Sequence, residues 1–189
     1  MGFFLNKNII MVQKSVDFNK KKFKKNNNEE IEDIISYITE HHKKGEDLRV
    51  IIGCDSKQKN RTTIYSLVIM LYDEFRHDGA HIVHMKFITN KERDLFTRLM
   101  NEAIYSLNLG LWLDENLNDI LKPAYKLNDY DKSSPVRKVE IHVDVNPKEN
   151  HKSNIAYNAI MGMLCGSGFY VKAKPIAPAA SCAADYLAN

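Results

Sequence analysis

Four acidic residues stand where the local pattern predicts burial. Asp55 ends the apolar run LRVIIGCDS (48–56), and Asp144 lies in the alternating stretch VEIHVDVNPKEN. Glu102 falls on an apolar helical stripe with leucines at offsets of three and seven residues, and Asp185 lies in the small-residue segment PAASCAADYL. A buried carboxylate needs hydrogen bonds, an opposite charge or a metal ion. One such residue alone is more simply a hydrogen-bonded structural acid, but four on different elements favour a shared site.

The predicted elements bring these acids together. If the strands that carry Asp55 and Asp144 are adjacent and parallel, the two side chains lie near the C-terminal strand ends, where open α/β sheets bind ligands. Helices then bring Glu102 and Asp185 to the same edge. Oxygen-only ligands favour Mg²⁺ or Mn²⁺, and two ions about 3.5–4 Å apart can align a water and stabilise the leaving oxygen of a phosphodiester.

Hydrophobic periodicity predicts an α/β fold. In order, we expect a helix, three strands, a helix, a strand, a helix, a strand and a terminal helix, at 28–45, 48–56, 62–73, 80–89, 91–113, 139–145, 151–168, 169–175 and 177–189. Asn28 is expected to cap the first helix and Gly45 to end it. Short connections make the first three strands an antiparallel meander. The strand–helix alternation that follows predicts a mixed five-stranded sheet with helices on both faces.

The chain divides into a basic N-terminal extension, residues 1–28, and one domain, residues 29–189. Six lysines stand within residues 14–25 against a single aspartate. Such a run is usually a solvated, flexible segment, and the functional alternative is a basic arm that touches phosphates.

Composition limits the class of protein. The 189 residues carry a net charge of +3, which permits a nucleic-acid partner without demanding one. No run approaches the roughly 18 apolar residues of a membrane span, and the start has no signal-peptide cleavage pattern. Three widely spaced cysteines without a CxxC pair predict buried, reduced thiols in a cytoplasmic protein. No dimer interface is evident, so the oligomeric state stays open.

Three further residues are auxiliary candidates. His142 shares a strand face with Asp144 and either orients a carboxylate, sits near the reacting phosphate or simply packs at a strand edge. Lys174 either neutralises a phosphate or is an ordinary surface lysine. Ser181 stands one helical turn before Asp185 and can hydrogen-bond that carboxylate. No accompanying base or oxyanion hole supports Ser181 as a nucleophile.

Basic residues flank both strand acids. They fit a polyanion held over a metal centre, although a solvated hairpin is the commoner meaning of such a turn. The candidates for substrate binding are Lys57, Lys59, Arg61 and Lys152.

Four stretches carry a resemblance to a known family: IIGCDS, RLMNEAIYSL, IHVDV and GSGFYVKAKPIAPAASCAAD. They resemble the YkuK-type family of ribonuclease-H-like nucleases over roughly residues 30–187. The resemblance implies a ribonuclease-H-like fold, with Asp55, Glu102, Asp144 and Asp185 as the catalytic, metal-binding carboxylates.

The sequence therefore predicts a divalent-metal-dependent nuclease that cleaves RNA, an RNA–DNA hybrid or DNA by a two-metal mechanism. One alternative is a non-catalytic nucleic-acid-binding or structural protein that keeps the fold, and another is a dimeric junction resolvase. Geometry separates the first two. Carboxylates more than about 8–10 Å apart, or paired with a lysine or arginine, disfavour two-metal catalysis.

Overall fold

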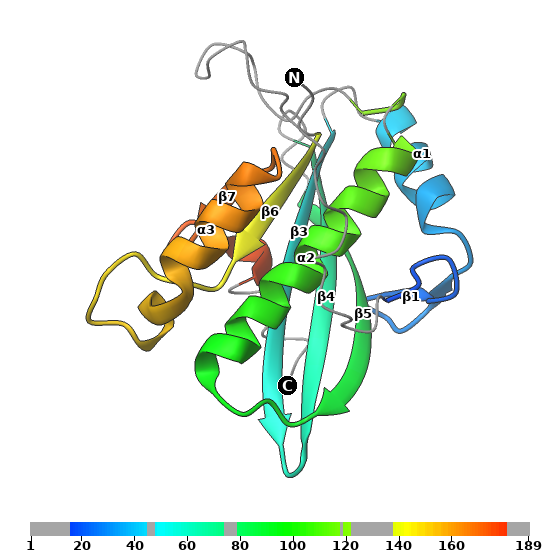
Figure 1. Cartoon of the computed structure of the whole chain (residues 1–189). Helices are drawn as coiled ribbons and strands as arrows, with labels where there is room; N and C mark the ends of the chain where they lie inside the picture. Colours follow the sequence, from blue (N-terminus) through cyan, green and yellow to red (C-terminus); the bar gives the residue numbers. More distant parts are fainter. Residues whose placement is uncertain (1–15, 45–47, 74–78, 118, 122–137, 181–189) are drawn as a thin grey trace, which may run out of the picture.

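A computed structural model of the chain describes residues 16–44, 48–73, 79–117, 119–121 and 138–180 (Figure 1). Within these ranges the strands are β1 (Phe23–Lys25), β2 (Glu30–Ile31), β3 (Leu48–Lys59), β4 (Thr62–Asp73), β5 (Ala80–Asn90), β6 (Val139–Val143) and β7 (Tyr170–Ala173). The helices are α1 (Ile34–Lys44), α2 (Leu95–Leu117) and α3 (Tyr157–Gly166), and the 3₁₀ turn η1 (Lys152–Ala156) precedes α3.

The strands form one mixed sheet in the order β2-β1-β5-β4-β3-β6-β7. β3, β4 and β5 make an antiparallel meander of long strands, and β6 and β7 add to β3 in parallel. This arrangement confirms the predicted fold class. The predicted number of five strands is wrong by two, because the N-terminal segment adds the short strands β1 and β2 beside β5.

The first helix begins later than predicted. Asn28 does not cap it but takes a left-handed φ of 65°, which turns the chain between β1 and β2. Asp33 accepts hydrogen bonds from the Ile35 amide at 2.9 Å and from the Ser36 hydroxyl at 2.6 Å. Asp33 therefore satisfies a free amide of the first turn, and α1 begins at Ile34.

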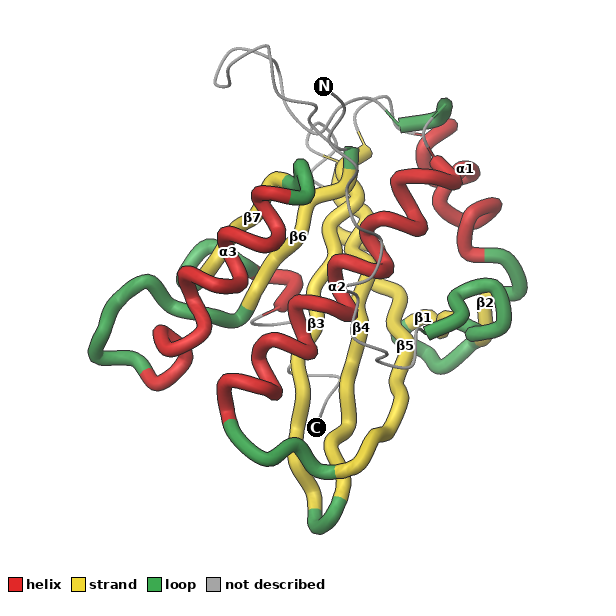
Figure 2. The backbone as a smooth tube through the Cα atoms, in the orientation of Figure 1, coloured by secondary structure: helices red, strands yellow, loops and turns green. Residues whose placement is uncertain are grey.

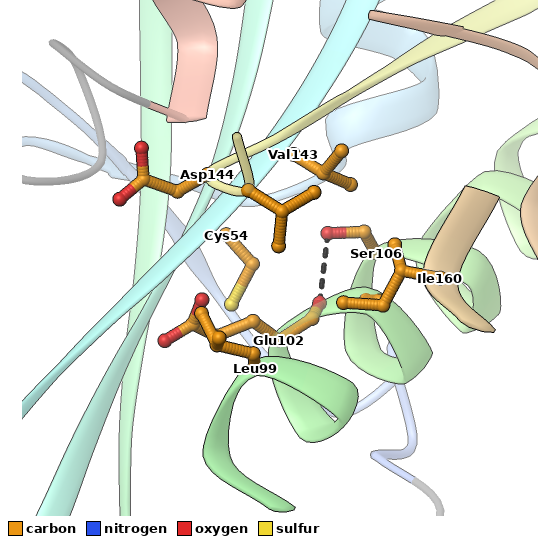
Figure 3. A pocket seen from close by; sticks show the side chains of 9 residues that line it. Cys54, Leu99, Glu102, Ser106, Val143, Asp144 and Ile160 are labelled. Atoms are coloured by element: carbon orange, nitrogen blue, oxygen red, sulfur yellow. Dashed lines mark hydrogen bonds between the residues drawn. The ribbon is translucent and has the colours of Figure 1, made fainter. Parts of the chain in front are cut away.

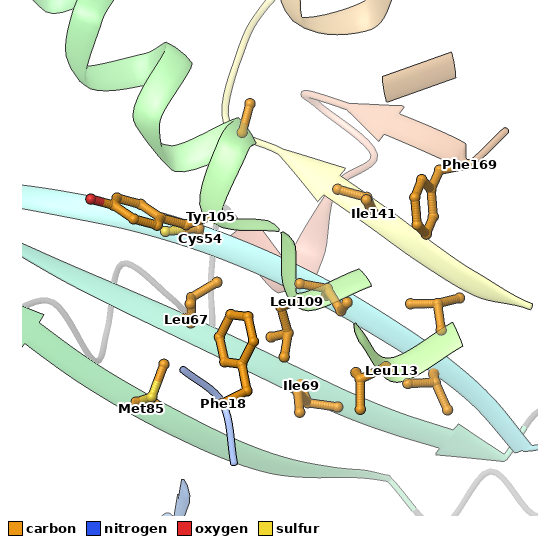
Figure 4. Packing of buried hydrophobic residues seen from close by; sticks show 14 of the residues in the cluster. Phe18, Cys54, Leu67, Ile69, Met85, Tyr105, Leu109, Leu113, Ile141 and Phe169 are labelled. Carbon is orange, nitrogen blue, oxygen red and sulfur yellow. The ribbon is translucent and has the colours of Figure 1, made fainter. Parts of the chain in front are cut away.

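The main core lies between the sheet and the three helices, which cover one face of it (Figure 2). Alternate β3 residues Val50, Ile52 and Cys54 point into this core, as a period of two requires. Figure 4 shows Leu109 and Leu113 of α2 lying against side chains of the central strands.

The opposite face of the sheet carries the chain that follows β7. Ala179 packs there with Ile51 and Met70 in a second, smaller cluster. Gly53 faces the backbone of Ala179 so closely that an added Cβ would lie 2.6 Å from it. Only glycine therefore fits at position 53. Residues 181–189, most of the predicted terminal helix, lie outside the described residues.

The cysteines and the helices bear on two predictions from composition. Cys54 is buried as predicted, but Cys165 is exposed, because it lies on the outer side of α3. Within the described ranges, no helix combines the length and hydrophobicity that crossing a membrane requires.

Candidate active site

Asp55 and Asp144 come together as the parallel pairing predicts. The β3–β6 register runs from Val50 opposite Val139 to Gly53 opposite His142. Two residues further along each strand stand Asp55 and Asp144, which therefore share the sheet face opposite α2. Both side chains are half-buried.

Glu102 approaches the same strand ends from α2. Its carboxylate is 4% exposed and accepts a hydrogen bond of 2.6 Å from the Ser56 hydroxyl, while Arg98 Nη1 lies 3.8 Å away. Burial raises the pKa of Glu102 to about 8, and the negative charges of Asp55 and Asp144 raise it further than the Ser56 and Arg98 contacts can offset. Glu102 therefore lies within range of the negative charges of both aspartates.

A small cavity lies beside these acids. Figure 3 shows Glu102 and Asp144 on its wall, with the Cys54 side chain between them and both carboxylates directed to the same side. The remaining lining is mostly apolar and comes from β6, α2 and α3, with Leu99, Ala103, Ser106, Val143, Val145 and Ile160. Its volume of ≈ 10 Å³ has room for about one water. Glu102 and Asp144 thus lie at the border between the apolar lining of this cavity and the polar end of β6.

Lys174 pairs directly with Asp144. Val143 of β6 pairs with Ala173 of β7. The residues that follow these two are Asp144 and Lys174, which therefore lie side by side. Lys174 Nζ lies 2.5 Å from Asp144 Oδ1, and the lysine side chain is 38% exposed. This is the lysine–carboxylate salt bridge that counts against metal binding at Asp144.

The fourth predicted acid, Asp185, and the auxiliary candidate Ser181 lie outside the described residues. Within the described part of the chain, no group of three or more His, Cys, Asp or Glu side chains lies close enough to hold a metal ion. Three of the four predicted ligands, Asp55, Glu102 and Asp144, therefore lie in the same region of the protein. Within the described residues they do not by themselves form a group that could hold a metal ion.

His142 is engaged at both ring nitrogens. The Ala179 amide donates to Nδ1 at 3.2 Å, so Nδ1 is an acceptor and the ring proton lies on Nε2. Nε2 lies 2.7 Å from Glu140 Oε1 and donates to it, and the His142 side chain is 1% exposed. These contacts hold residue 179 against the sheet and leave His142 no free nitrogen for a phosphate.

Glu140 is the centre of a buried ion cluster on the same face. It pairs with Arg49 and lies 3.0 Å from Lys172 Nζ, in addition to the His142 bond. Burial raises the pKa of Glu140, but the His142 hydrogen bond and the Arg49 charge outweigh burial and lower that pKa to about 2. Glu140 is thus an ionised, fully partnered acid.

The predicted substrate-binding residues are exposed but do not gather in one place. Lys57 follows Asp55 by two residues and so lies on the same face of β3. Lys59 and Arg61 flank Asn60 at the tip of the β3–β4 hairpin, which protrudes past the end of α2 in Figure 1. Lys152 lies in the η1 turn after β6.

Two residues around Glu102 escaped the sequence analysis. Arg98 stands one helical turn before Glu102 and also donates to the Ser56 carbonyl at 2.7 Å. The spacing of four residues was a usable signal for Arg98. Ser56 had no such signal, because its contact with Glu102 joins residues 46 positions apart.

Comparisons with known proteins gave one result. Searches of curated proteins and of solved structures found no match. A model of the family described as ribonuclease H-like matches residues 29–189, which is most of the chain and confirms the family that the sequence motifs indicated. The chain belongs to the ribonuclease H-like family.

Proposed function

We propose that the protein is a divalent-metal-dependent nuclease that hydrolyses phosphodiester bonds of RNA, RNA–DNA hybrid or DNA. The observation that carries the proposal is that Asp55, Asp144 and Glu102 lie together where β6 ends beside β3, and that burial and the charges of the two aspartates raise the pKa of Glu102. Carboxylates that repel one another lose that repulsion when a cation binds between them. Membership of the ribonuclease H-like family supports the same reading.

The donor types suit Mg²⁺ or Mn²⁺, since carboxylate oxygens are the ligands these hard cations prefer. The residues that would hold the ions are Asp55, Glu102, Asp144 and Asp185. A cation held there would activate a water for attack on phosphorus and stabilise the leaving oxygen.

The chain's own residues have three tasks in this proposal. Ser56 and Arg98 hold the Glu102 carboxylate in place at the strand end. Lys174 must move off Asp144, and its partly exposed side chain can do so into solvent. Once released, the Lys174 ammonium can neutralise a phosphate of the substrate beside Asp144.

A cleavage assay tests the proposal. Labelled single-stranded RNA, RNA–DNA hybrid, single-stranded DNA and branched DNA are incubated with Mn²⁺ or Mg²⁺ and the wild-type protein. Asp144→Asn keeps the shape of the side chain but removes its charge, so it should lower cleavage at least about 100-fold. Asp119→Asn, at an exposed position after α2, is the matched control and should cleave as the wild type does.

Equal cleavage by the wild type and Asp144→Asn would refute the assigned role. Cleavage confined to branched DNA, by a protein that is dimeric in solution, would instead assign the junction-resolvase alternative.

A specific observation favours a second candidate, a non-catalytic nucleic-acid-binding protein. Lys174 neutralises Asp144 directly, and the described residues by themselves supply no closed set of metal ligands. If the protein has this second function, Mn²⁺ should not change its binding of oligonucleotides, and it should cleave no substrate in the panel.

A further inference from the structure

A basic hollow lies over the neighbouring strands β1 and β5, away from the carboxylates. Its volume is ≈ 300 Å³, and its lining residues are Lys22, Lys24, Asn28, His84, Met85 and Lys86. Three of these six are lysines, and a fourth is a histidine. A concave surface of this composition suits an anion.

The N-terminal segment is anchored so that it presents these lysines. Phe23 of β1 is 1% exposed and packs in the main core, as does Phe18, whose ring lies 5.8 Å from that of Trp112 (Figure 4). Because side chains alternate along a strand, Lys22 and Lys24 project to the opposite face. Both lysines precede residue 29, where the family match begins.

The charges in the hollow are only partly balanced. Lys24 lies 3.4 Å from Glu30, and Lys22 lies 3.3 Å from Glu30 and 3.0 Å from Glu32. These side chains are 43–83% exposed, so solvent screens the pairs and a phosphate can compete for the lysines. Lys86 is exposed and makes no ion pair with any residue in the described ranges.

His84 leaves a polar atom unsatisfied at this hollow. It is 5% exposed, and its Nδ1 has no hydrogen-bond partner among the described residues. Burial lowers the pKa of His84, and the nearby charges of Lys86 and Lys24 lower it further, so the ring is neutral. A buried polar atom without a partner is costly, which marks His84 as an unusual residue in the wall of this hollow.

Strand register connects the hollow to the carboxylates. Asp55 pairs with Ser66, and Ser66 pairs with Lys86, so these three residues form one row across β3, β4 and β5 on the same face. Neighbouring strands lie about 4.8 Å apart, which places Lys86 about 10 Å from Asp55. Lys24, on the next strand, pairs with His84, two residues along β5 from Lys86, and so lies about 16 Å from Asp55.

We infer that the hollow binds the phosphodiester backbone of a nucleic acid, with Lys86 and Lys24 contacting phosphates about three to five nucleotides from the carboxylates at a rise of about 3.4 Å per nucleotide. This placement of the bound strand rests on the proposed function. The binding surface itself rests on the hollow, its lysines and the unpartnered histidine.

Salt-dependent binding tests the inference. Fluorescence anisotropy measures the affinity of a labelled single-stranded oligonucleotide in the presence of a chelator, so that no cleavage occurs. Each phosphate contact contributes about 0.7 to the slope of log affinity against log salt. Lys24→Gln with Lys86→Gln should therefore lower that slope by about 1.4 and weaken binding about 25-fold near 0.1 M salt.

Two further variants control for non-specific charge effects. Lys43→Gln, on an exposed position of α1, removes an equivalent charge outside the hollow and should bind as the wild type does. Glu30→Gln frees Lys24, removes one of the two acidic partners of Lys22, and should strengthen binding. A structural role for these ion pairs does not predict this gain.

The failure of this inference and the failure of the nuclease proposal are distinguishable. Wild-type affinity and salt slope in the Lys24→Gln and Lys86→Gln double variant would overturn the inference, even if metal-dependent cleavage is found. An equal loss of binding in Lys43→Gln would overturn it as well. Weakened binding in the double variant alone would uphold the hollow, even if no cleavage is found.

Discussion

Two buried glutamates, Glu140 on β6 and Glu102 on α2, have pKa values that are shifted in opposite directions. Glu140 is 1% exposed and Glu102 is 4% exposed, so burial penalises both charges. Arg49, His142 and Lys172 surround Glu140, and its pKa falls to about 2. Glu102 has a hydroxyl at 2.6 Å and an arginine at 3.8 Å, faces the charges of two aspartates, and its pKa rises to about 8.

The difference teaches how to separate a structural acid from a reactive one. Arg49 and Lys172 balance the negative charge of Glu140, so this charge stabilises the fold. Glu102 shares its surroundings with like charges, so its ionised form lacks a sufficient counter-charge in the chain alone. A divalent cation would supply that counter-charge, which is why the proposed nuclease centre lies at Glu102 and not at Glu140.

The largest expected effect on stability concerns Glu140→Gln. The change leaves Arg49 and Lys172 beside a neutral amide in a buried cluster, so we expect the free energy of unfolding to fall by about 3 kcal/mol at pH 7. Urea denaturation measures this loss. A loss below about 0.5 kcal/mol would break the comparison, because the cluster would then contribute nothing through its charge.

The pH dependence of the Glu140 contribution follows from its lowered pKa. The stabilisation is fully present above about pH 4.5, the ordinary value, and is lost as the pH falls toward about 2. The wild type and Glu140→Gln should therefore converge in stability at low pH.

An effect of opposite sign and similar size at pH 7 is expected for Glu102→Gln. The folded protein holds the Glu102 proton more tightly than the unfolded chain does, because the pKa is raised from 4.5 to about 8. Stability should thus fall between these pH values by up to about 1.4 kcal/mol per pH unit. Glu102→Gln should lack this decline, so it gains on the wild type as the pH rises.

Urea denaturation at a series of pH values, with a chelator present, measures the difference between the wild type and Glu102→Gln. A constant difference in stability between pH 4.5 and about 8 would contradict the raised pKa of Glu102.

The sequence predicted the parts of the molecule that depend on local pattern. Continuous and alternating apolar runs identified β3 and β6, and their parallel pairing placed Asp55 beside Asp144 as expected. The leucine stripe correctly predicted that Glu102 is buried on α2. The partner of Asp144 was not predictable, because the register of β6 and β7 brings Lys174 to it across 30 positions of the chain.

The N-terminal segment shows a different limit. Its lysine run predicted a solvated arm, but Phe18 and Phe23 pack in the core, and residues 23–25 add a strand to the sheet. Two aromatic residues within a charged run carry little signal, since their burial depends on contacts with distant residues such as Trp112. The boundary between extension and domain at residue 29 stays a prediction.

Mn²⁺ binding tests the central claim most directly. Isothermal titration calorimetry compares the wild type with Asp144→Asn and with the exposed control Asp119→Asn. The account predicts saturable binding to the wild type and to Asp119→Asn, and an affinity at least about 10-fold weaker for Asp144→Asn. No binding to the wild type, or equal affinity in all three proteins, would contradict it.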